Sequence, residues 1–218
     1  MKQALFTSFL FCCVALTSWA QTDSVSSPFL FKDLQDVTVH LKDGRVFHEK
    51  MNYNLLVEKF YFVDRADGQT KVLSNPETIN VIKFGSRTFY PENGAGIEIL
   101  STDPALYVQY KGRVSKEPAI AGYGTSRLAS IKTYKGMDSQ GGQSFAYEPD
   151  KMLVDSHYNI YWIEKDGNKK EFINFKKLLK IYSEHKKELE LYIKENNVKF
   201  DDSQQVLKLC VYAESLGK

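Results

Sequence analysis

The chain has 218 residues, with 29 lysines and arginines against 27 aspartates and glutamates, which gives a formal net charge of +2 at pH 7. This near-neutral balance excludes the global electrostatic attraction by which basic proteins bind nucleic acid or anionic surfaces. Aromatic residues make up 13% of the chain and there are only 6 prolines, a composition typical of a folded, sheet-rich protein.

The first twenty residues have the layout of a Sec signal peptide. Lys2 supplies a positive charge, an apolar run follows, and Ser18-Trp19-Ala20 places small residues where a signal peptidase cleaves. The apolar run is shorter than the roughly 18 to 20 residues that a membrane-spanning helix needs, which disfavours a retained anchor. We therefore predict cleavage after Ala20, export through the Sec system, and a location in the periplasm, at the cell surface or outside the cell.

The 3 cysteines bear on the same question. Cys12 and Cys13 lie within the predicted signal peptide, and neither follows the small residue that precedes a lipidated cysteine. The mature chain keeps only Cys210, which cannot form an intramolecular disulfide. Cys210 belongs to an apolar helical pattern, for which we expect a buried, unreactive thiol.

A Ser-rich lead-in, residues 21–33, is expected to be mobile. From Asp36 onward, short segments alternate apolar and polar residues between turn signals, which predicts an antiparallel meander. Tight hairpins are predicted at three Asp-Gly pairs, at residues 43–44, 67–68 and 166–167.

The strand pattern stops at about residues 115–150, which are rich in glycine and lack apolar periodicity. We expect a long loop there, within a β-rich domain of residues 34–174. Loops longer than about 12 to 15 residues are usually either functional or disordered, and the sequence leaves both open. If the loop is functional, its candidate binding residues are Gly122, Tyr123, Gly124, Thr125, Ser126, Arg127, Lys132 and Tyr134.

The remaining residues, 175–218, change to a helical period. We expect two or three helices, packed on the same domain, with Ser183 as an N-terminal cap of the second and Asp201-Asp202-Ser203 offering caps for the last. The apolar positions of these helices are Phe175, Leu178, Leu179 and Tyr182, then Leu189, Tyr192 and Ile193, then Val206, Leu209, Cys210, Ala213 and Leu216. Glutamates alternate with the lysines of 176–199, so this basic stretch is interpreted as a solvated helix surface and no nucleic acid is expected as a partner.

The pattern as a whole predicts an α+β fold. An antiparallel β-rich body, either a meander or roll or a sandwich of short strands, precedes the C-terminal helices. No apolar segment of the mature chain is long enough to be a transmembrane helix.

Metal binding is tested first at His40 and His48, which lie on one predicted hairpin. With a two-residue Asp-Gly loop, His40 pairs with Phe47, so the two imidazoles point to opposite faces of the sheet and cannot share an ion. No other spacing resembles a zinc site, and the single aspartate of "GMDSQGGQ" supplies too few oxygen ligands for calcium. We expect neither a metal nor another cofactor.

Catalytic motifs are equally weak. The stretch Gly122-Tyr123-Gly124-Thr125-Ser126 is not a G-x-S-x-G nucleophile elbow. "ENGAGIEIL" lacks the third glycine and the following helix of a dinucleotide site, so a hairpin turn explains it better. No pair of carboxylates suggests glycosidase chemistry. We therefore expect the protein not to be an enzyme.

Several segments, among them "LKDGRVFHEKMNYNLLVEKFYFVDRADG", "GSRTFYP" and "YWIEKDGNKKEFINFKKLLKIYSEHKKELELYIKENNVKF", resemble uncharacterised exported proteins of Bacteroidetes-type Gram-negative bacteria. The resemblance implies an envelope location and brings no activity, cofactor or catalytic residue. The favoured hypothesis is a non-enzymatic binding or structural module of the envelope, with an unidentified protein or small ligand as partner and an undetermined oligomeric state. Two alternatives stay open: a carrier of a lipid or glycan in an aromatic-lined β pocket, and an envelope hydrolase.

Overall fold

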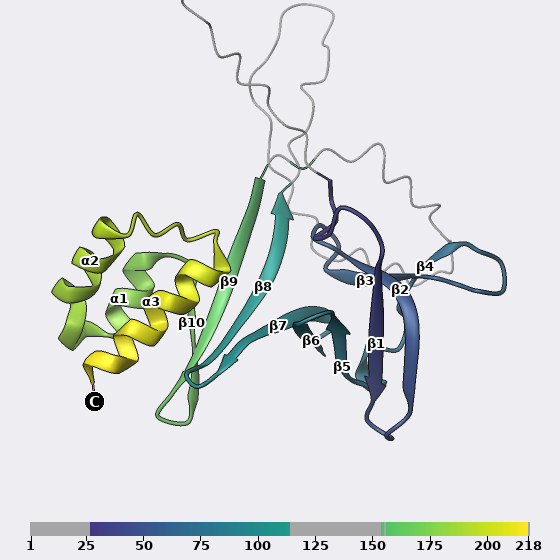
Figure 1. The fold of residues 1–218 in the computed structure, drawn as a ribbon, viewed down its shortest axis with the longest axis horizontal. Helices are drawn as coiled ribbons and strands as arrows, with labels where there is room; N and C mark the ends of the chain where they lie inside the picture. Colours follow the sequence, from purple (N-terminus) through teal and green to yellow (C-terminus); the bar gives the residue numbers. More distant parts are fainter. Residues whose placement is uncertain (1–26, 114–153, 155, 218) are drawn as a thin grey trace, which may run out of the picture.

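The structure, a computed structural model, describes residues 27–113, 154 and 156–217. In these residues ten strands form one antiparallel sheet, and three α-helices follow at the C-terminal end (Figure 1). The predicted α+β fold with a β-rich body is therefore confirmed. The eight candidate binding residues of the glycine-rich segment lie outside the described residues.

The strands are β1 (Gln35–Leu41), β2 (Val46–Asn54), β3 (Lys59–Val63), β4 (Thr70–Val72), β5 (Ile79–Phe84), β6 (Arg87–Glu92), β7 (Ala95–Thr102), β8 (Ala105–Arg113), β9 (Ser156–Lys165) and β10 (Asn168–Phe172). Their order across the sheet is β10-β9-β8-β7-β6-β5-β1-β2-β3-β4. The helices are α1 (Phe175–Ile181), α2 (Lys186–Glu195) and α3 (Ser203–Leu216), with short 3₁₀ turns at Pro76–Thr78 and Ser183–His185.

The sheet curls into a roll because the β2–β3 connection returns to β8. The backbone N–H of Gly112 donates to the carbonyl of Leu55 at 2.8 Å. Close packing at the neighbouring strand depends on Gly96, where an added Cβ would lie 2.5 Å from the ring of Phe60 and 2.8 Å from that of Tyr53. A side chain at Gly96 would therefore hold the two parts of the roll apart.

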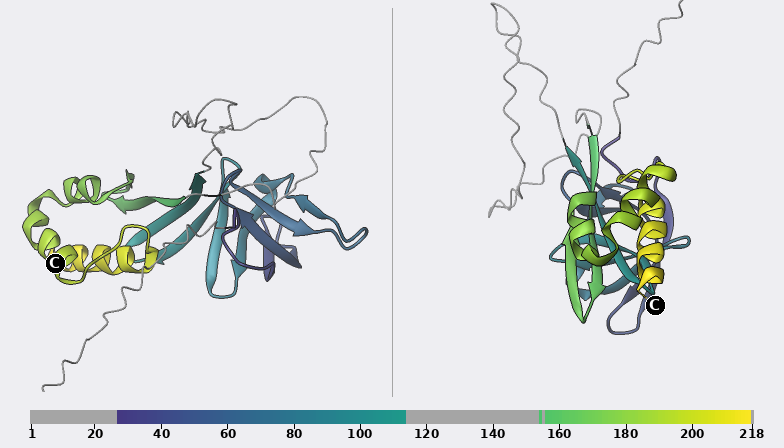
Figure 2. Two further views of the ribbon diagram at one scale, coloured as in Figure 1. Left: turned by 90° about the horizontal axis from the view of Figure 1, so that it is seen from above. Right: turned by 90° about the vertical axis from the view of Figure 1, so that its left-hand side faces the viewer.

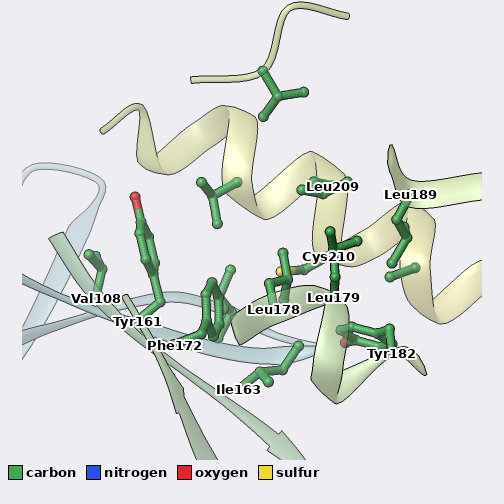
Figure 3. Close-up of a cluster of buried hydrophobic side chains, with 14 residues drawn as sticks. Val108, Tyr161, Ile163, Phe172, Leu178, Leu179, Tyr182, Leu189, Leu209 and Cys210 are labelled. Carbon is green, nitrogen blue, oxygen red and sulfur yellow. The ribbon is translucent and has the colours of Figure 1, made fainter. Parts of the chain in front are cut away.

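Two hydrophobic clusters make up the core. One fills the roll and consists of Val37, Val39, Met51, Tyr53, Leu55, Phe60, Ile79, Ile82, Phe84 and Phe89. The other lies between β8–β10 and the helices, which gather at one end of the molecule (Figure 2). Figure 3 shows Tyr161, Ile163 and Phe172 of the sheet in one cluster with the helical residues Leu178, Leu209 and Cys210. Tyr110 packs against both clusters.

The hairpin at Asp166-Gly167 has the predicted two-residue turn. Lys165 pairs with Asn168, and the two central residues have φ values of 55° and 71°, as a type I′ turn requires. The same arrangement at Asn93-Gly94, with φ values of 51° and 80°, joins β6 to β7. The interpretation of "ENGAGIEIL" as a hairpin turn is thus confirmed.

The first hairpin differs from the prediction. Its loop has three residues, 42–44, because the N–H of Leu41 donates to the carbonyl of Arg45 at 2.9 Å. His40 consequently pairs with Val46, and His48 pairs with Thr38. A shift of one residue moves every side chain of a strand to the other face. The prediction that His40 and His48 face opposite ways was therefore wrong, because both lie on the face that carries Thr38.

Helix capping is partly as predicted. The carboxylate of Asp202 accepts hydrogen bonds from the N–H groups of Gln204 and Gln205, at 3.0 and 3.1 Å, at the start of α3. Ser183, in contrast, is not the N-cap of α2. It begins a 3₁₀ turn that fills the bend between α1 and α2, so its backbone lacks the extended conformation of an N-cap, and α2 begins after His185 without a side-chain cap. Within the described part of the chain, no helix is long and apolar enough to cross a membrane.

The folded region begins earlier than the sequence suggests. The N–H of Leu30 donates to the carbonyl of Tyr53 at 2.9 Å, and the ring of Phe31 stacks on that of Phe84 with centroids 4.9 Å apart. Residues 28–31 are therefore packed on the roll, in contrast to the expectation of a mobile lead-in.

Candidate functional site

The glycine-rich segment of the sequence lies between β8 and β9, which are neighbours in the sheet. β8 ends at Arg113 and β9 begins at Ser156, and these two residues pair in the ladder. These two flanking residues therefore lie side by side, at the upper ends of β8 and β9 in Figure 1.

A groove of about 400 Å³ lies at this point, and we call it the β8–β9 groove. It is formed by the end of β8, the first half of β9, the β10–α1 connection and the α2–α3 connection. Its lining residues are Arg113, His157, Tyr158, Asn159, Ile160, Ile173, Phe200 and Asp201. Four segments that are distant in the sequence thus form one concave surface.

Two buried polar side chains of β9 hold the α2–α3 connection in place. The hydroxyl of Tyr161 donates to the carbonyl of Phe200 at 2.9 Å. The side-chain amide of Asn159 donates to the carbonyl of Asp201 at 2.8 Å and to the Tyr161 oxygen at 2.9 Å. Burial raises the pKa of Tyr161, so its hydroxyl stays protonated and remains a donor. The groove wall is therefore fixed by hydrogen bonds as well as by packing.

The apolar part of the groove rests on the helical core. The ring of Phe200 meets those of Tyr161 and Phe175 edge to face, with centroids 5.1 and 5.2 Å apart. Ile173 lies beside it, and 45% of this isoleucine is exposed. Ile173 thus adds an exposed apolar side chain beside an ordered aromatic cluster.

The polar part of the groove has groups of both charges. The guanidinium carbon of Arg113 lies 4.5 Å from the centre of the Tyr158 ring, a cation–π contact that orients both side chains. His157 and Asp201 add an imidazole and a carboxylate to the lining. The arrangement can hold a ligand that combines an apolar portion with hydrogen-bonding groups.

Potential metal ligands and nucleophiles are few among the described residues. Among residues 27–113, 154 and 156–217, no three His, Cys, Asp or Glu side chains form a group that could hold a metal ion. Cys210 is buried as predicted, and burial, assisted by the nearby Glu214, raises the pKa of its thiol to about 12. A thiol in this state is a poor nucleophile.

An ion pair with a buried carboxylate joins the neighbouring strands β6 and β7. The guanidinium of Arg87 donates to both carboxylate oxygens of Glu98, each at 2.8 Å, and Glu98 is only 3% exposed. Burial alone would lower the pKa of Arg87, but the hydrogen bonds and charge of Glu98 outweigh it and hold that pKa above its ordinary value. The guanidinium also lies 4.9 to 5.2 Å from the ring centres of Phe31, Phe89 and Tyr110.

Tyr110 connects this ion pair to α3. Its hydroxyl lies 2.5 Å from Glu98 and 3.1 Å from the hydroxyl oxygen of Ser203. Because the single phenolic proton goes to the carboxylate, Ser203 donates to Tyr110. Burial and the charge of Glu98 both raise the pKa of Tyr110, so its hydroxyl stays protonated and donates to Glu98. We interpret this network as structural.

The aromatic side chains inside the roll pack on one another. Phe84 stacks on Phe31 and Phe60 and meets Phe89 edge to face, with centroid distances of 4.9, 6.1 and 5.2 Å. They therefore form a core of the kind that stabilises a fold.

Comparison of the chain with protein-family models, with curated proteins and with solved structures gives no match. The groove was not predicted from the sequence, because Ile173, Phe200 and Asp201 reach it only through the packing of the helices. One signal was present: Tyr158 and Ile160 alternate in "HYNIYW", which marks them as residues of one strand face.

Proposed function

We propose that the protein is an exported, non-enzymatic binding module of the bacterial envelope that holds its partner in the β8–β9 groove. The observation that supports this proposal best is the position of the groove at the base of the glycine-rich segment, which the sequence singles out as a contact region. Its fixed wall, exposed apolar side chain and mixed polar lining are features of a binding surface.

The binding role is tested by site-specific photocrosslinking in the native bacterium. A benzoylphenylalanine placed at Ile173, inside the groove, should give one discrete adduct on irradiation. The control is the same amino acid at Val211, which is 47% exposed on α3 and does not line the groove. Equal adducts from both positions, or none from Ile173 in folded protein, would count against the groove.

The exported location needs a separate experiment. Cell fractionation should recover the chain outside the cytoplasm, and its intact mass should show the loss of residues 1–20. A full-length chain in the cytoplasm would contradict export. Native mass spectrometry of the same sample would reveal a co-purified lipid or glycan, which would favour a carrier instead.

A further inference from the structure

Among the described residues, no strand pairs with the first half of β2 on the side away from β1. β3 pairs with Met51–Asn54 and ends at Val63, opposite Lys50, so Val46–Glu49 have β1 beside them but, within the described residues, no strand opposite. Figure 1 shows the β1–β2 hairpin and the β3–β4 hairpin separating in different directions.

The hydrogen-bond pattern shows which backbone groups face this open side. Leu41 and Arg45 are hydrogen-bonded across the β1–β2 ladder, and pairs in an antiparallel ladder alternate between bonded and non-bonded. The N–H and C=O groups of Val46, His48 and Lys50 therefore point away from β1. In agreement, the carbonyl of His48 accepts a hydrogen bond from the Arg65 guanidinium, which reaches it from beyond the end of β3.

The other edges of the sheet are protected in ways that natural proteins commonly use. β4 is only three residues long, and β10 carries Lys169 and Lys170. The open part of β2 instead exposes two large apolar side chains, Val46 at 47% and Phe47 at 41%. Neighbours on a strand point to opposite faces, so an added strand would meet an apolar side chain on each face.

A cleft of about 370 Å³ runs beside this edge. It is lined by Asp36, Val37, Thr38, His48, Glu49, Lys50, Val63 and Arg65. Its charges are largely paired with each other, Lys50 with Asp36 at 3.1 Å and Arg65 with Glu49 at 3.3 Å. The cleft therefore suits an uncharged, extended backbone better than a charged ligand.

We propose that the open edge of β2, residues 46–49, binds an extended apolar peptide segment of a partner protein by adding it to the sheet as a strand. The Arg65 guanidinium, which donates to the His48 carbonyl, stands in for the backbone N–H that such a strand would supply. A second copy of the chain is the alternative occupant, and sedimentation distinguishes it from a peptide of a partner protein. This surface is separate from the β8–β9 groove.

The experiment uses random dodecapeptides displayed on phage and selected on the purified mature protein. The best peptide is then synthesised, and its affinity is measured by fluorescence polarisation. Val46→Pro removes an outward N–H without touching the β1–β2 ladder, and should weaken binding roughly fivefold to tenfold. Arg65→Ala frees the His48 carbonyl and should leave binding as tight or tighter.

The matched control is Val72→Pro. Val72 is 43% exposed and, by the same alternation from the Leu73–Phe60 hydrogen bond, points its N–H outward from the short edge strand β4. Peptide affinity should be unchanged in this variant, and thermal melting should show that both proline variants fold.

Amide hydrogen exchange gives a second measurement that needs no variant. The peptide should slow exchange at Val46 and His48. Selected peptides that leave these amides unprotected, a selection that yields no binder, or equal affinity for both proline variants would overturn the proposal. A dimer observed in sedimentation that dissociates in the Val46→Pro variant would show that the edge binds a second copy of the chain. That outcome would also overturn the proposal.

Discussion

Arg87 and Glu98 form a bidentate ion pair between neighbouring strands, with both hydrogen bonds 2.8 Å long. The side chain of Glu98 is 4% exposed and that of Arg87 is 33% exposed, so the pair is shielded from solvent mainly on the carboxylate side. Removing one member of such a pair leaves the other with a buried and poorly compensated charge.

We expect Glu98→Gln to lower the free energy of unfolding by about 2 to 3 kcal/mol, less than for a fully buried pair because Arg87 keeps some contact with water. Urea unfolding measures this change. Glu92→Gln is the control, because Glu92 meets Lys169 at 3.3 Å on the surface and should contribute about 0.5 kcal/mol or less. Equal effects of the two substitutions would show that burial does not strengthen the Arg87 pair.

A second prediction concerns Glu58, a non-glycine residue with a φ of 57°. Its carboxylate contacts Gln109 at 2.6 Å and Lys111 at 2.7 Å, which offsets a backbone conformation that L-residues disfavour. Glu58→Ala loses the contacts and keeps the strain, whereas Glu58→Gly loses the contacts and relieves it. The glycine variant should therefore be more stable than the alanine variant by about 1 kcal/mol in urea unfolding. The reverse order would mean that the backbone at Glu58 is not strained.

Helix capping provides a third prediction. Asp202→Ala removes the acceptor for two N–H groups at the start of α3 and should cost about 1 kcal/mol. Ser183→Ala should change stability by less than about 0.5 kcal/mol, because Ser183 makes no capping hydrogen bond at α2. Thermal melting of the two variants, followed by circular dichroism, compares them directly. If Ser183→Ala lowered the stability as much as Asp202→Ala does, Ser183 would cap α2 as the sequence predicted.

The buried thiol gives a fourth prediction. In the folded protein the pKa of Cys210 is raised from 9.0 to about 12, chiefly by burial. The unfolded chain thus releases this proton at a lower pH than the folded chain. The stability contributed by the protonated thiol is complete below about pH 9 and is lost as the pH rises toward about 12.

Urea unfolding across this range should show the stability falling with pH more steeply in the native sequence than in Cys210→Ala. Between about pH 9 and pH 10.5 the difference in the fall should approach about 2 kcal/mol. Parallel curves for the two proteins would indicate that the thiol does not remain protonated in the fold. Tyr161 and Tyr182 lie close enough to Cys210 to sense its charge, but burial raises the pKa of both hydroxyls, so they stay protonated in the folded state over this range.

The sequence predicted those features that depend on local pattern. Alternation predicted the strands, the spacing of Leu178 and Leu179 predicted a buried helix face, and Asp166-Gly167 predicted a hairpin turn. The first hairpin was mispredicted because a three-residue loop with Gly44 at a φ of 90° also satisfies an Asp-Gly signal. Local sequence does not distinguish the two loop lengths, and the choice reverses the faces of both strands.

The surfaces proposed for binding depend on contacts that no local pattern encodes. The β8–β9 groove needs Phe200 to pack on Tyr161, across 39 residues of sequence. The open edge of β2 exists because β3 ends at Val63 and no described strand continues beside Val46–Glu49, and the length of β3 is not encoded in the pattern of β2. The binding role of residues 122–127, 132 and 134 of the glycine-rich segment remains a prediction from the sequence.

The position of α3 has a consequence for incomplete chains. This last helix contributes Val206, Leu209, Cys210 and Ala213 to the core that covers one face of β8–β10. A chain that stops before α3 would still contain every strand of the sheet, but it would present Leu106, Val108 and Tyr161 to water. Such a product should aggregate and be readily degraded, because its exposed apolar surface can associate with other chains and its partly unfolded segments can be cleaved by proteases.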